Sequence, residues 1–501
     1  MTFRLDWIDA WARYSPDKVA IRECESGKTI TYSQYNNIAN NISKKLTKEI
    51  GLVKGDRVAI LAENCLEYFI LFSAAQKTGI TLVPLNYRLA VPEIDYLLHD
   101  SKPSLLIVQD TFKAKSDQCE HRNEIEHELS LEDIDCDAYI DKRCTFETDS
   151  TIEETDPLFI LYTAGTTGFP KGALYTHRML FWNSINTTMR LNITSDDRSV
   201  SCTPLFHTGG WNVIPTPFLH RGASFCLTRT FDPDAILRLM EEDKSTMFMA
   251  VPTMLQMMVD SDLFSQVQLK HMRFFIIGGE PMPLPLIRKW HDKGVPIRQG
   301  YGMTEAGPSI TSLHQDDAIR KMGSIGLPNF YIDTKIVDEA GNEVGANQVG
   351  ELLLKGPSVT TGYWQNESVT RESIVDGWLH TGDLVVKDDD GFLFVVDRKK
   401  NMYISGGENV YPAEVEKVLH SHDKVAEAAV IGVPDDKWGE VGSAFIVLKQ
   451  GAQLSEEELI DFCTGRLAKY KTPKHIQFIE TLPRSDAGKL DRKAMKELIK
   501  K

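Results

Sequence analysis

Short apolar runs and a longer apolar segment alternate in the first part of the chain. Residues 58–61 predict a buried strand, and residues 66–77 predict a mostly buried helix. Residues 80–85 then predict a second strand. Two strands joined through a helix pair in parallel, so this stretch is typical of a strand–helix–strand unit.

Further apolar runs repeat the pattern as far as about residue 397. They span residues 104–108, 158–162 and 273–277. We therefore expect an α/β fold in which helices are layered on sheets. Residues 111–155 are polar and acidic, and we expect them to form an excursion on the surface.

A charged segment, residues 397–401, follows the strand-like run 392–396 and marks a boundary. Beyond it, Pro412 suits the first position of a helix. We therefore expect a large N-terminal α/β domain with several subdomains over residues 1–397. A small α+β C-terminal domain should follow over residues 398–501.

Composition and charge narrow the class of protein. The 501 residues are 42% hydrophobic, which suits large cores, and the net charge of −15 argues against nucleic-acid binding. No apolar stretch is long enough to span a bilayer, and the N-terminus lacks the apolar run of a signal peptide. The eight cysteines contain no CxxC pair. We therefore expect a cytoplasmic protein with neither a zinc site nor a disulfide framework.

Residues 162–172, Tyr-Thr-Ala-Gly-Thr-Thr-Gly-Phe-Pro-Lys-Gly, carry the most specific chemistry. The three glycines permit sharp turns and close approach to a ligand, the three threonines offer hydroxyl donors, and Lys171 adds positive charge. These properties predict a loop that holds phosphates. A Walker A loop would end in Gly-Lys-Ser/Thr, whereas this loop ends in Lys171-Gly172, which disfavours an ordinary P-loop ATPase.

Seven motifs, in the same order along the chain, resemble the adenylate-forming superfamily. The first is the 162–172 loop. The others are Pro-Leu-Phe-His at 204–207, Gly-Gly-Glu-Pro-Met at 278–282, Gln-Gly-Tyr-Gly-Met-Thr-Glu at 299–305, Thr-Gly-Asp at 381–383, Asp-Arg at 397–398 and Pro-Arg-x-x-x-Gly-Lys at 483–489. The resemblance spans essentially the whole chain, and the sequence is most similar to fatty-acyl-CoA synthetases and 4-coumarate:CoA ligase-like enzymes. It implies that the C-terminal domain is mobile.

The resemblance implies an ATP-dependent acyl-CoA synthetase. Such an enzyme activates a fatty or aryl carboxylic acid as acyl-AMP, forms the acyl-CoA thioester, and releases AMP and pyrophosphate. It would use ATP, Mg²⁺ and coenzyme A, with a small-molecule carboxylic acid as partner substrate, and a homodimer is compatible with it. The alternative is an acyl-AMP ligase that transfers the acyl group to a carrier protein. A luciferase-like oxygenase and a non-catalytic ATP-binding regulator are more distant alternatives.

The resemblance also implies roles for single residues. Lys489 would lie over the reacting carboxylate and the α-phosphate, Glu305 would bind Mg²⁺, and Thr304 would contact phosphate and metal. Asp383 and Arg398 would hold the ribose. The expected ligands of ATP and coenzyme A are Thr163, Gly165, Thr166, Thr167, Gly168, Lys171, Gly279, Glu280, Pro281, Gln299, Gly300, Tyr301, Gly302, Asp383, Arg398, Gly406 and Gly407.

His207 bears on which acid is the substrate, and we count it among the expected catalytic residues. It stands where the adenylation domains of peptide synthetases usually carry an aspartate that binds the substrate amine. A histidine cannot serve as counter-ion to an ammonium group, so amino-acid substrates are disfavoured. We expect an apolar pocket, with Trp211 either as its floor or as simple core packing.

Overall fold

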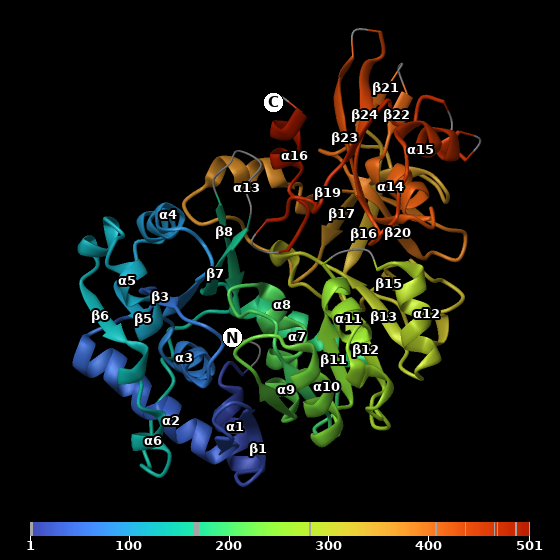
Figure 1. Ribbon diagram of the computed structural model, residues 1–501. Helices are drawn as coiled ribbons and strands as arrows, with labels where there is room; N and C mark the ends of the chain where they lie inside the picture. Colours follow the sequence, from blue (N-terminus) through green and yellow to red (C-terminus); the bar gives the residue numbers. More distant parts are fainter. Residues whose placement is uncertain are drawn as a thin grey trace. The chain divides into compact units, whose positions relative to one another are not determined.

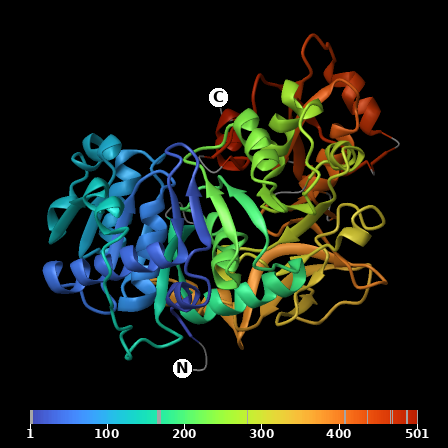
Figure 2. The ribbon, with the colours of Figure 1, turned by 90° about the horizontal axis from the view of Figure 1, so that it is seen from below.

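The computed structural model describes residues 4–163, 170–279, 282–405, 408–435, 437–464, 466–467, 469–485 and 488–499. The chain forms two compact units (Figure 1 and Figure 2). The first unit contains residues 1–334 and 354–379, and the second contains residues 335–353 and 380–501. Both mix helices and strands, which confirms the predicted fold class.

A six-stranded sheet in the first unit contains the predicted strand–helix–strand unit. Its order is β6-β5-β3-β4-β7-β8. The strands are β3 (Arg57–Leu61), β4 (Thr81–Leu85), β5 (Leu105–Val108), β6 (His127–Ser130), β7 (Pro157–Thr163) and β8 (Lys171–Thr176). Helix α3 (Leu66–Thr78) connects β3 to β4, and these two strands pair in parallel as expected. The helix ends at Gly79, whose φ of 74° lies in the left-handed region that glycine tolerates.

The expectation that residues 111–155 lie on the surface is wrong in part. Strand β6 falls in this segment and extends the sheet by pairing in parallel with β5. Leu131, Ile134 and Cys136 are buried. Only a few apolar residues of this otherwise acidic segment are buried. The polar composition of the whole segment therefore did not indicate the strand or the buried residues.

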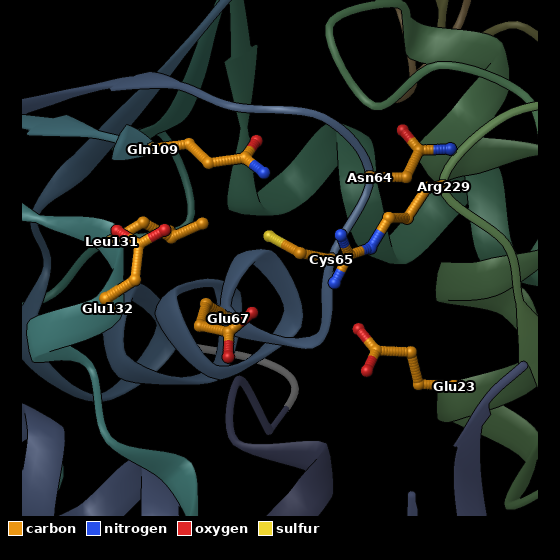
Figure 3. Close-up of a pocket in the computed structure, with 8 residues that line it drawn as sticks. All are labelled: Glu23, Asn64, Cys65, Glu67, Gln109, Leu131, Glu132 and Arg229. Carbon is orange, nitrogen blue, oxygen red and sulfur yellow. The ribbon is translucent and has the colours of Figure 1, made fainter. Parts of the chain in front are cut away.

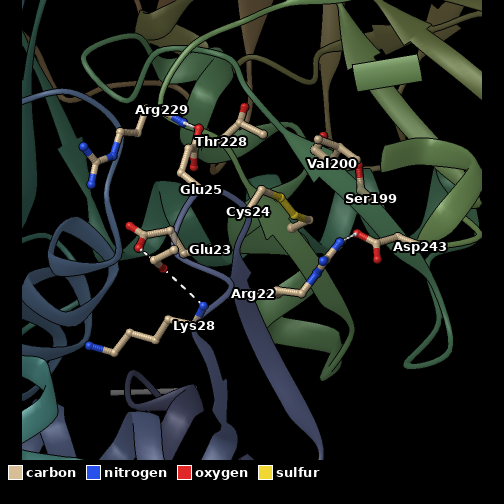
Figure 4. The surroundings of a disulfide bond; sticks show 12 residues. Arg22, Glu23, Cys24, Glu25, Lys28, Ser199, Val200, Thr228, Arg229 and Asp243 are labelled. Carbon is tan, nitrogen blue, oxygen red and sulfur yellow. Dashed lines mark hydrogen bonds and ion pairs between the residues drawn. A yellow bond between two sulfur atoms is a disulfide. The ribbon is translucent and has the colours of Figure 1, made fainter. Parts of the chain in front are cut away.

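A second sheet of the first unit brings two distant cysteines together. Its order is β2-β1-β10-β9, with β1 (Val19–Glu23), β2 (Thr29–Thr31), β9 (Arg198–Ser201) and β10 (Ser224–Leu227). Because β1 and β10 pair in parallel, Cys24 and Cys226 lie with their Cα atoms 6.1 Å apart and form a disulfide (Figure 4). The expectation of no disulfide is therefore wrong for this pair, since sequence spacing does not reveal which strands will be neighbours.

A third sheet of the first unit has the order β11-β12-β13-β14-β15. Its strands are β11 (Met247–Ala250), β12 (Phe274–Ile277), β13 (Ile297–Tyr301), β14 (Thr311–Ser312) and β15 (Leu327–Pro328). Strands β11, β12 and β13 run in parallel, so their carboxyl ends meet at one edge. Open α/β sheets bind ligands beyond such an edge.

The second unit contains a small sheet of order β22-β21-β24-β23, with β25 paired to β24. Its strands are β21 (Tyr403–Ser405), β22 (Glu408–Val410), β23 (Val425–Asp435), β24 (Gly439–Leu448) and β25 (His475–Phe478). Strands β19 (Trp378–Lys387) and β20 (Leu393–Arg398) pair antiparallel. The chain crosses between the two units within β16 (Asp333–Val337), β17 (Val349–Lys355) and β19, whereas α13 (Glu367–Ser373) and β18 (Ile374–Val375) belong to the first unit.

Helices cover the sheets of each unit (Figure 1). In the first unit they are α1 (Trp7–Tyr14), α2 (Tyr32–Lys44), α4 (Val91–Ser101), α5 (Lys113–Ser116), α6 (Cys136–Tyr139), α7 (His177–Leu191), α8 (Thr208–Asn212), α9 (Pro215–Arg221), α10 (Pro233–Glu242), α11 (Pro252–Val259) and α12 (Leu284–Asp292). In the second they are α14 (Pro412–His420), α15 (Glu456–Cys463) and α16 (Arg492–Ile499). Across the described ranges, every helix is too short or too polar to cross a membrane.

Two buried histidines make the stability of the first unit depend on pH. Burial lowers the pKa of His177 and of His220 to about 4, and the His220 ring stacks on Trp7 at 4.0 Å. In the unfolded chain a histidine titrates near pH 6.5. The unfolded state therefore binds more protons between pH 6.5 and 4, and stability falls as the pH drops through this window.

We expect each buried histidine to lower the free energy of unfolding by about 2 kcal/mol between pH 7 and pH 5. Urea unfolding at the two pH values measures this loss. Leucine cannot take up a proton. His177→Leu should therefore remove the part of the stability loss between pH 7 and pH 5 that is due to one histidine, whatever the variant's stability at pH 7. An unchanged pH dependence in this variant would contradict the assignment.

Candidate functional site

The predicted phosphate loop connects the two strands of a β-hairpin. Strands β7 and β8 pair antiparallel, and Thr163 and Lys171 are the last facing pair before the loop. Of the loop's expected ligands, Gly165, Thr166, Thr167 and Gly168 lie outside the described residues. The hairpin thus fixes Thr163 and Lys171, the two described residues that flank the loop.

Glu305, the expected metal ligand, lies against this hairpin. It belongs to a short 3₁₀ turn, Thr304–Ala306, and is 7% exposed. The hydroxyl of Thr163 donates a hydrogen bond to Oε1 of Glu305 at 3.2 Å. The structure therefore brings together three residues that the sequence placed in one site, Thr163, Lys171 and Glu305, while Thr304 remains partly exposed beside them.

Tyr363 completes this cluster and was missed by sequence reasoning. Its hydroxyl donates to Oε1 of Glu305 at 3.1 Å, and Nζ of Lys171 lies 5.7 Å from the centroid of its ring. Oε2 of Glu305 has no hydrogen-bond partner among the described residues. One carboxylate oxygen thus accepts hydrogen bonds from two hydroxyls, and the other could accept a cation. Oxygen donors of this kind are the ligands that Mg²⁺ prefers.

The carboxyl edge of β11, β12 and β13 gathers the glycines of two further motifs. A Cβ atom on Gly278 would lie 3.5 Å from the carbonyl oxygen of Gly300, so these two segments lie side by side. Gly302 allows no side chain, because a Cβ there would clash with the carbonyl oxygen of Pro308. The close backbone packing explains why glycine occupies these positions.

The neighbours of these glycines differ in their access to ligand. Gly279 is exposed and Tyr301 is partly exposed at the strand edge, which suits contact with a nucleotide. Gln299 is 6% exposed, and its amide donates to the carbonyl oxygen of Ser324 at 3.2 Å. Glu280 and Pro281 lie outside the described residues.

His207 immediately precedes α8, in a loop that reaches strand β11. The hydroxyl of Thr203 donates to the sulfur of Met249 at 3.3 Å, and a Cβ on Gly209 would lie 3.4 Å from the methyl group of Met249. The loop therefore borders the same strand edge as the glycines. His207 is partly exposed there, and its ring packs edge-on against Phe206.

Trp211 belongs to the core. It is fully buried, and its ring lies 5.0 Å from Phe69 and from Phe159, and 5.8 Å from Phe72. Its indole N–H donates to the carbonyl oxygen of Leu205. Of the two readings that the sequence left open, core packing is the observed one, and the interior beneath α8 is filled with aromatic rings.

A polar cavity of about 160 Å³ lies elsewhere in the first unit (Figure 3). Its wall includes the carboxylates of Glu23, Glu67 and Glu132 together with Arg229. Burial, followed by the nearby Glu23 carboxylate, raises the pKa of Glu67. This chemistry does not match the apolar pocket expected for the acid. The wall residue Asn64 instead has a supporting role.

Asn64 fixes the loop that carries His207. Its side-chain carbonyl accepts a hydrogen bond from the backbone N–H of Leu205 at 2.9 Å. Its amide donates to the carbonyl oxygens of Thr203 at 3.1 Å and of Thr228 at 3.3 Å. The side chain is 3% exposed, so these bonds form away from water and hold the loop against strand β10.

Asp383 and Arg398, the expected ribose ligands, meet in the second unit. They face each other across β19 and β20, and Nε of Arg398 lies 3.1 Å from Oδ1 of Asp383. Asp383 is 5% exposed, whereas the side chain of Arg398 is half exposed. A buried carboxylate held by a guanidinium remains an acceptor, as contact with ribose hydroxyls requires.

Lys489 lies on an exposed turn of the second unit. The N–H of Ser485 donates to its carbonyl oxygen at 2.7 Å, and Gly488 has a φ of 78°. Desolvation, and then the charges of Arg398, Lys489 and Arg492, lower the pKa of Lys400. Lys489 therefore belongs to a positively charged region of this unit. Gly406 and Gly407 lie outside the described residues.

Residues 8–364 match the AMP-binding enzyme family, and residues 414–489 match the AMP-binding enzyme C-terminal domain. The chain belongs to the AMP-binding enzyme family, which confirms the resemblance to the adenylate-forming superfamily. The two matches contain five of the seven sequence motifs, and the motifs at 381–383 and 397–398 fall between them.

Individual relatives match the chain over nearly its full length. It is 37% identical to a feruloyl-CoA synthase from Amycolatopsis sp, over 97% of this chain and 96% of the relative. It is 36% identical to an indoleacetate–CoA ligase from Aromatoleum aromaticum, over 99% and 98%. The o-succinylbenzoate CoA synthetase from Bacillus subtilis, solved with its acyl-adenylate intermediate, is 33% identical, with a TM-score of 0.88 and 98% coverage of both chains. That enzyme has also been solved with ATP and a magnesium ion.

Proposed function

We propose that this protein activates an aryl or arylalkyl carboxylic acid. It is an ATP-dependent acyl-CoA synthetase, an acid–thiol ligase that works through acyl-AMP and releases AMP and pyrophosphate. The single observation that carries the choice of acid is the filled interior beneath α8. Trp211 and its aromatic neighbours fill this interior, so a long acyl chain could not extend beneath α8.

The residues beside the His207 loop support a flat, compact acid. Met249 lies partly exposed next to Gly209, and a methionine sulfur makes favourable contacts with aromatic rings. The relatives named for ferulate and indoleacetate act on acids of this shape. Position 207 carries a histidine and not a carboxylate that could pair with a substrate amine. The acid would therefore carry no amino group.

The described residues fit ATP and Mg²⁺. Glu305 would hold Mg²⁺, with Thr304 beside it, and the metal would supply charge neutralisation at the phosphates. Thr163 and Lys171 would hold the phosphates, while Gly279, Gly300 and Tyr301 would lie along the adenine. Asp383 and Arg398 would hold the ribose, and Lys489 would neutralise charge that develops as the mixed anhydride forms.

The substrate proposal is tested by a panel of acids with ATP and CoA. We expect kcat/KM for hydroxycinnamic and indoleacetic acids to exceed that for hexadecanoic acid at least about tenfold. Octanoic acid serves as the control for size without a ring. A preference for hexadecanoic acid would contradict the proposal that the filled interior beneath α8 determines which acid is accepted.

A carrier protein is the alternative acceptor that the sequence left open. The same assay separates the two, since CoA alone supports thioester formation only in a CoA ligase. We also propose that residues 1–397 and 398–501 act as the two catalytic domains. The family matches end at 364 and begin again at 414, which is compatible with this division.

A cytoplasmic location, where ATP and CoA are both available, and assembly as a homodimer are further proposals. Fractionation of cells and light scattering of the purified protein test them. Detection in a secreted fraction would contradict the first, and a mass near 56.5 kDa would contradict the second.

A further inference from the structure

Segment 358–364 lies along β8 and forms an additional edge of the β7–β8 hairpin. The N–H of Trp364 donates to the carbonyl oxygen of Gly172 at 2.7 Å, and the N–H of Leu174 donates to that of Gly362 at 3.1 Å. An antiparallel bridge pairs Ala173 with Tyr363. Tyr363 therefore has a backbone fixed by the strand that begins at Lys171.

The same segment also holds the turn that carries Glu305. The N–H of Thr360 donates to the carbonyl oxygen of Glu305 at 2.7 Å, and the hydroxyl of Ser358 donates to that of Ala306 at 3.2 Å. One short stretch of chain is thus bonded to both the phosphate-loop hairpin and the Glu305 turn. The side chain of Tyr363 lies where these two elements meet.

The two contacts of the Tyr363 side chain serve two different residues. Its hydroxyl donates to Oε1 of Glu305 at 3.1 Å, and its ring lies 5.7 Å from Nζ of Lys171, within the range of a cation–π contact. The tyrosine hydroxyl is the donor in this bond, because a carboxylate oxygen accepts. Oε2 of Glu305 keeps no partner in the described parts of the chain.

We infer that Tyr363 is a positioning residue that orients Glu305 toward Mg²⁺ and Lys171 toward the phosphates of ATP. This inference rests on the proposed role of Glu305. The tyrosine hydroxyl fixes the carboxylate through one oxygen, so that the other faces the metal without rotation. A carboxylate that is already held in one orientation loses less conformational entropy when a metal binds, so binding is stronger.

The test is calorimetric titration of ATP into the full-length protein, without acid or CoA, in Mg²⁺ and in EDTA. We expect Tyr363→Phe, which removes only the hydroxyl, to weaken ATP binding in Mg²⁺ roughly tenfold, because the lost hydrogen bond is to a charged group. Binding in EDTA should be unchanged, since the ring beneath Lys171 remains. Tyr363→Leu should weaken binding under both conditions.

Tyr175→Phe is the matched control. Tyr175 lies on β8 of the same hairpin, and its buried hydroxyl has no hydrogen-bond partner in the described structure. It should bind ATP as the unaltered protein does. In a Glu305→Gln background, Tyr363→Phe should have little further effect on Mg²⁺-dependent binding, whereas a general structural role would give the same loss in both backgrounds.

The outcomes separate the inference from the function on which it rests. If the unaltered protein binds ATP equally in Mg²⁺ and in EDTA, the role of Glu305 is wrong and the inference falls with it. If binding depends on Mg²⁺ but Tyr363→Phe behaves as the unaltered protein, only the inference is overturned. Equal losses in Mg²⁺ and in EDTA would also overturn it.

Discussion

Replacement of Lys489 by alanine should lower the rate of ATP–pyrophosphate exchange by about 10²–10³-fold, as loss of a donor at developing negative charge does. Thioester formation from preformed acyl-AMP and CoA should continue at a near-normal rate. This split is expected because the ammonium group is needed when the carboxylate attacks the α-phosphate and the mixed anhydride forms. It is not needed when the thiol attacks that anhydride.

Lys496→Ala is the matched control for Lys489→Ala. Lys496 is an exposed lysine on α16 of the same unit, so its loss changes the net charge equally. It should leave both half-reactions intact. Pyrophosphate exchange near the normal rate in Lys489→Ala would show that this lysine does not act in adenylation.

Replacement of Lys77 by methionine should lower the free energy of unfolding of the first unit by about 3–5 kcal/mol, because it leaves a buried charge without its partner. Lys77 is 1% exposed and forms an ion pair with Asp6, and Asn36 accepts a further hydrogen bond from its Nζ at 2.9 Å. Methionine keeps most of the volume, so the effect reports the uncompensated Asp6 carboxylate. Urea unfolding measures it.

Arg13→Met supplies the comparison with an exposed ion pair. Arg13 pairs with Asp9 at 2.7 Å, but its side chain is 60% exposed. The loss should be below about 1 kcal/mol. Similar losses in the two variants would mean that burial does not set the cost at Lys77. The double variant Asp6→Ala, Lys77→Met should lose less than the sum of the two single losses.

Much of the fold followed from apolar patterning. The strands at 58–61 and 80–85, the helix between them and the helix beginning at Pro412 all formed where expected. The first three elements are buried on both faces, and a continuous apolar run bounded by turn residues is a local signal for such elements. Strand β6 was missed, since this short edge strand has a single apolar residue, Leu129, and so no continuous apolar run.

The pattern of apolar residues could not predict which segments distant in sequence lie next to each other. The Cys24–Cys226 disulfide depends on β1 lying next to β10, and no local feature of the sequence indicates that these two strands are neighbours. Tyr363 was missed for the same reason: its partners Lys171 and Glu305 are distant in sequence. The pairing of Asp383 with Arg398, by contrast, follows from two strands joined by a short turn.

The most direct test of the central claim is the product balance with a hydroxycinnamic acid, ATP, Mg²⁺ and CoA. Acyl-CoA, AMP and pyrophosphate should form in equal amounts, and acyl-AMP should accumulate when CoA is left out. Release of ADP and phosphate, or the absence of thioester with every acid tried, would contradict it.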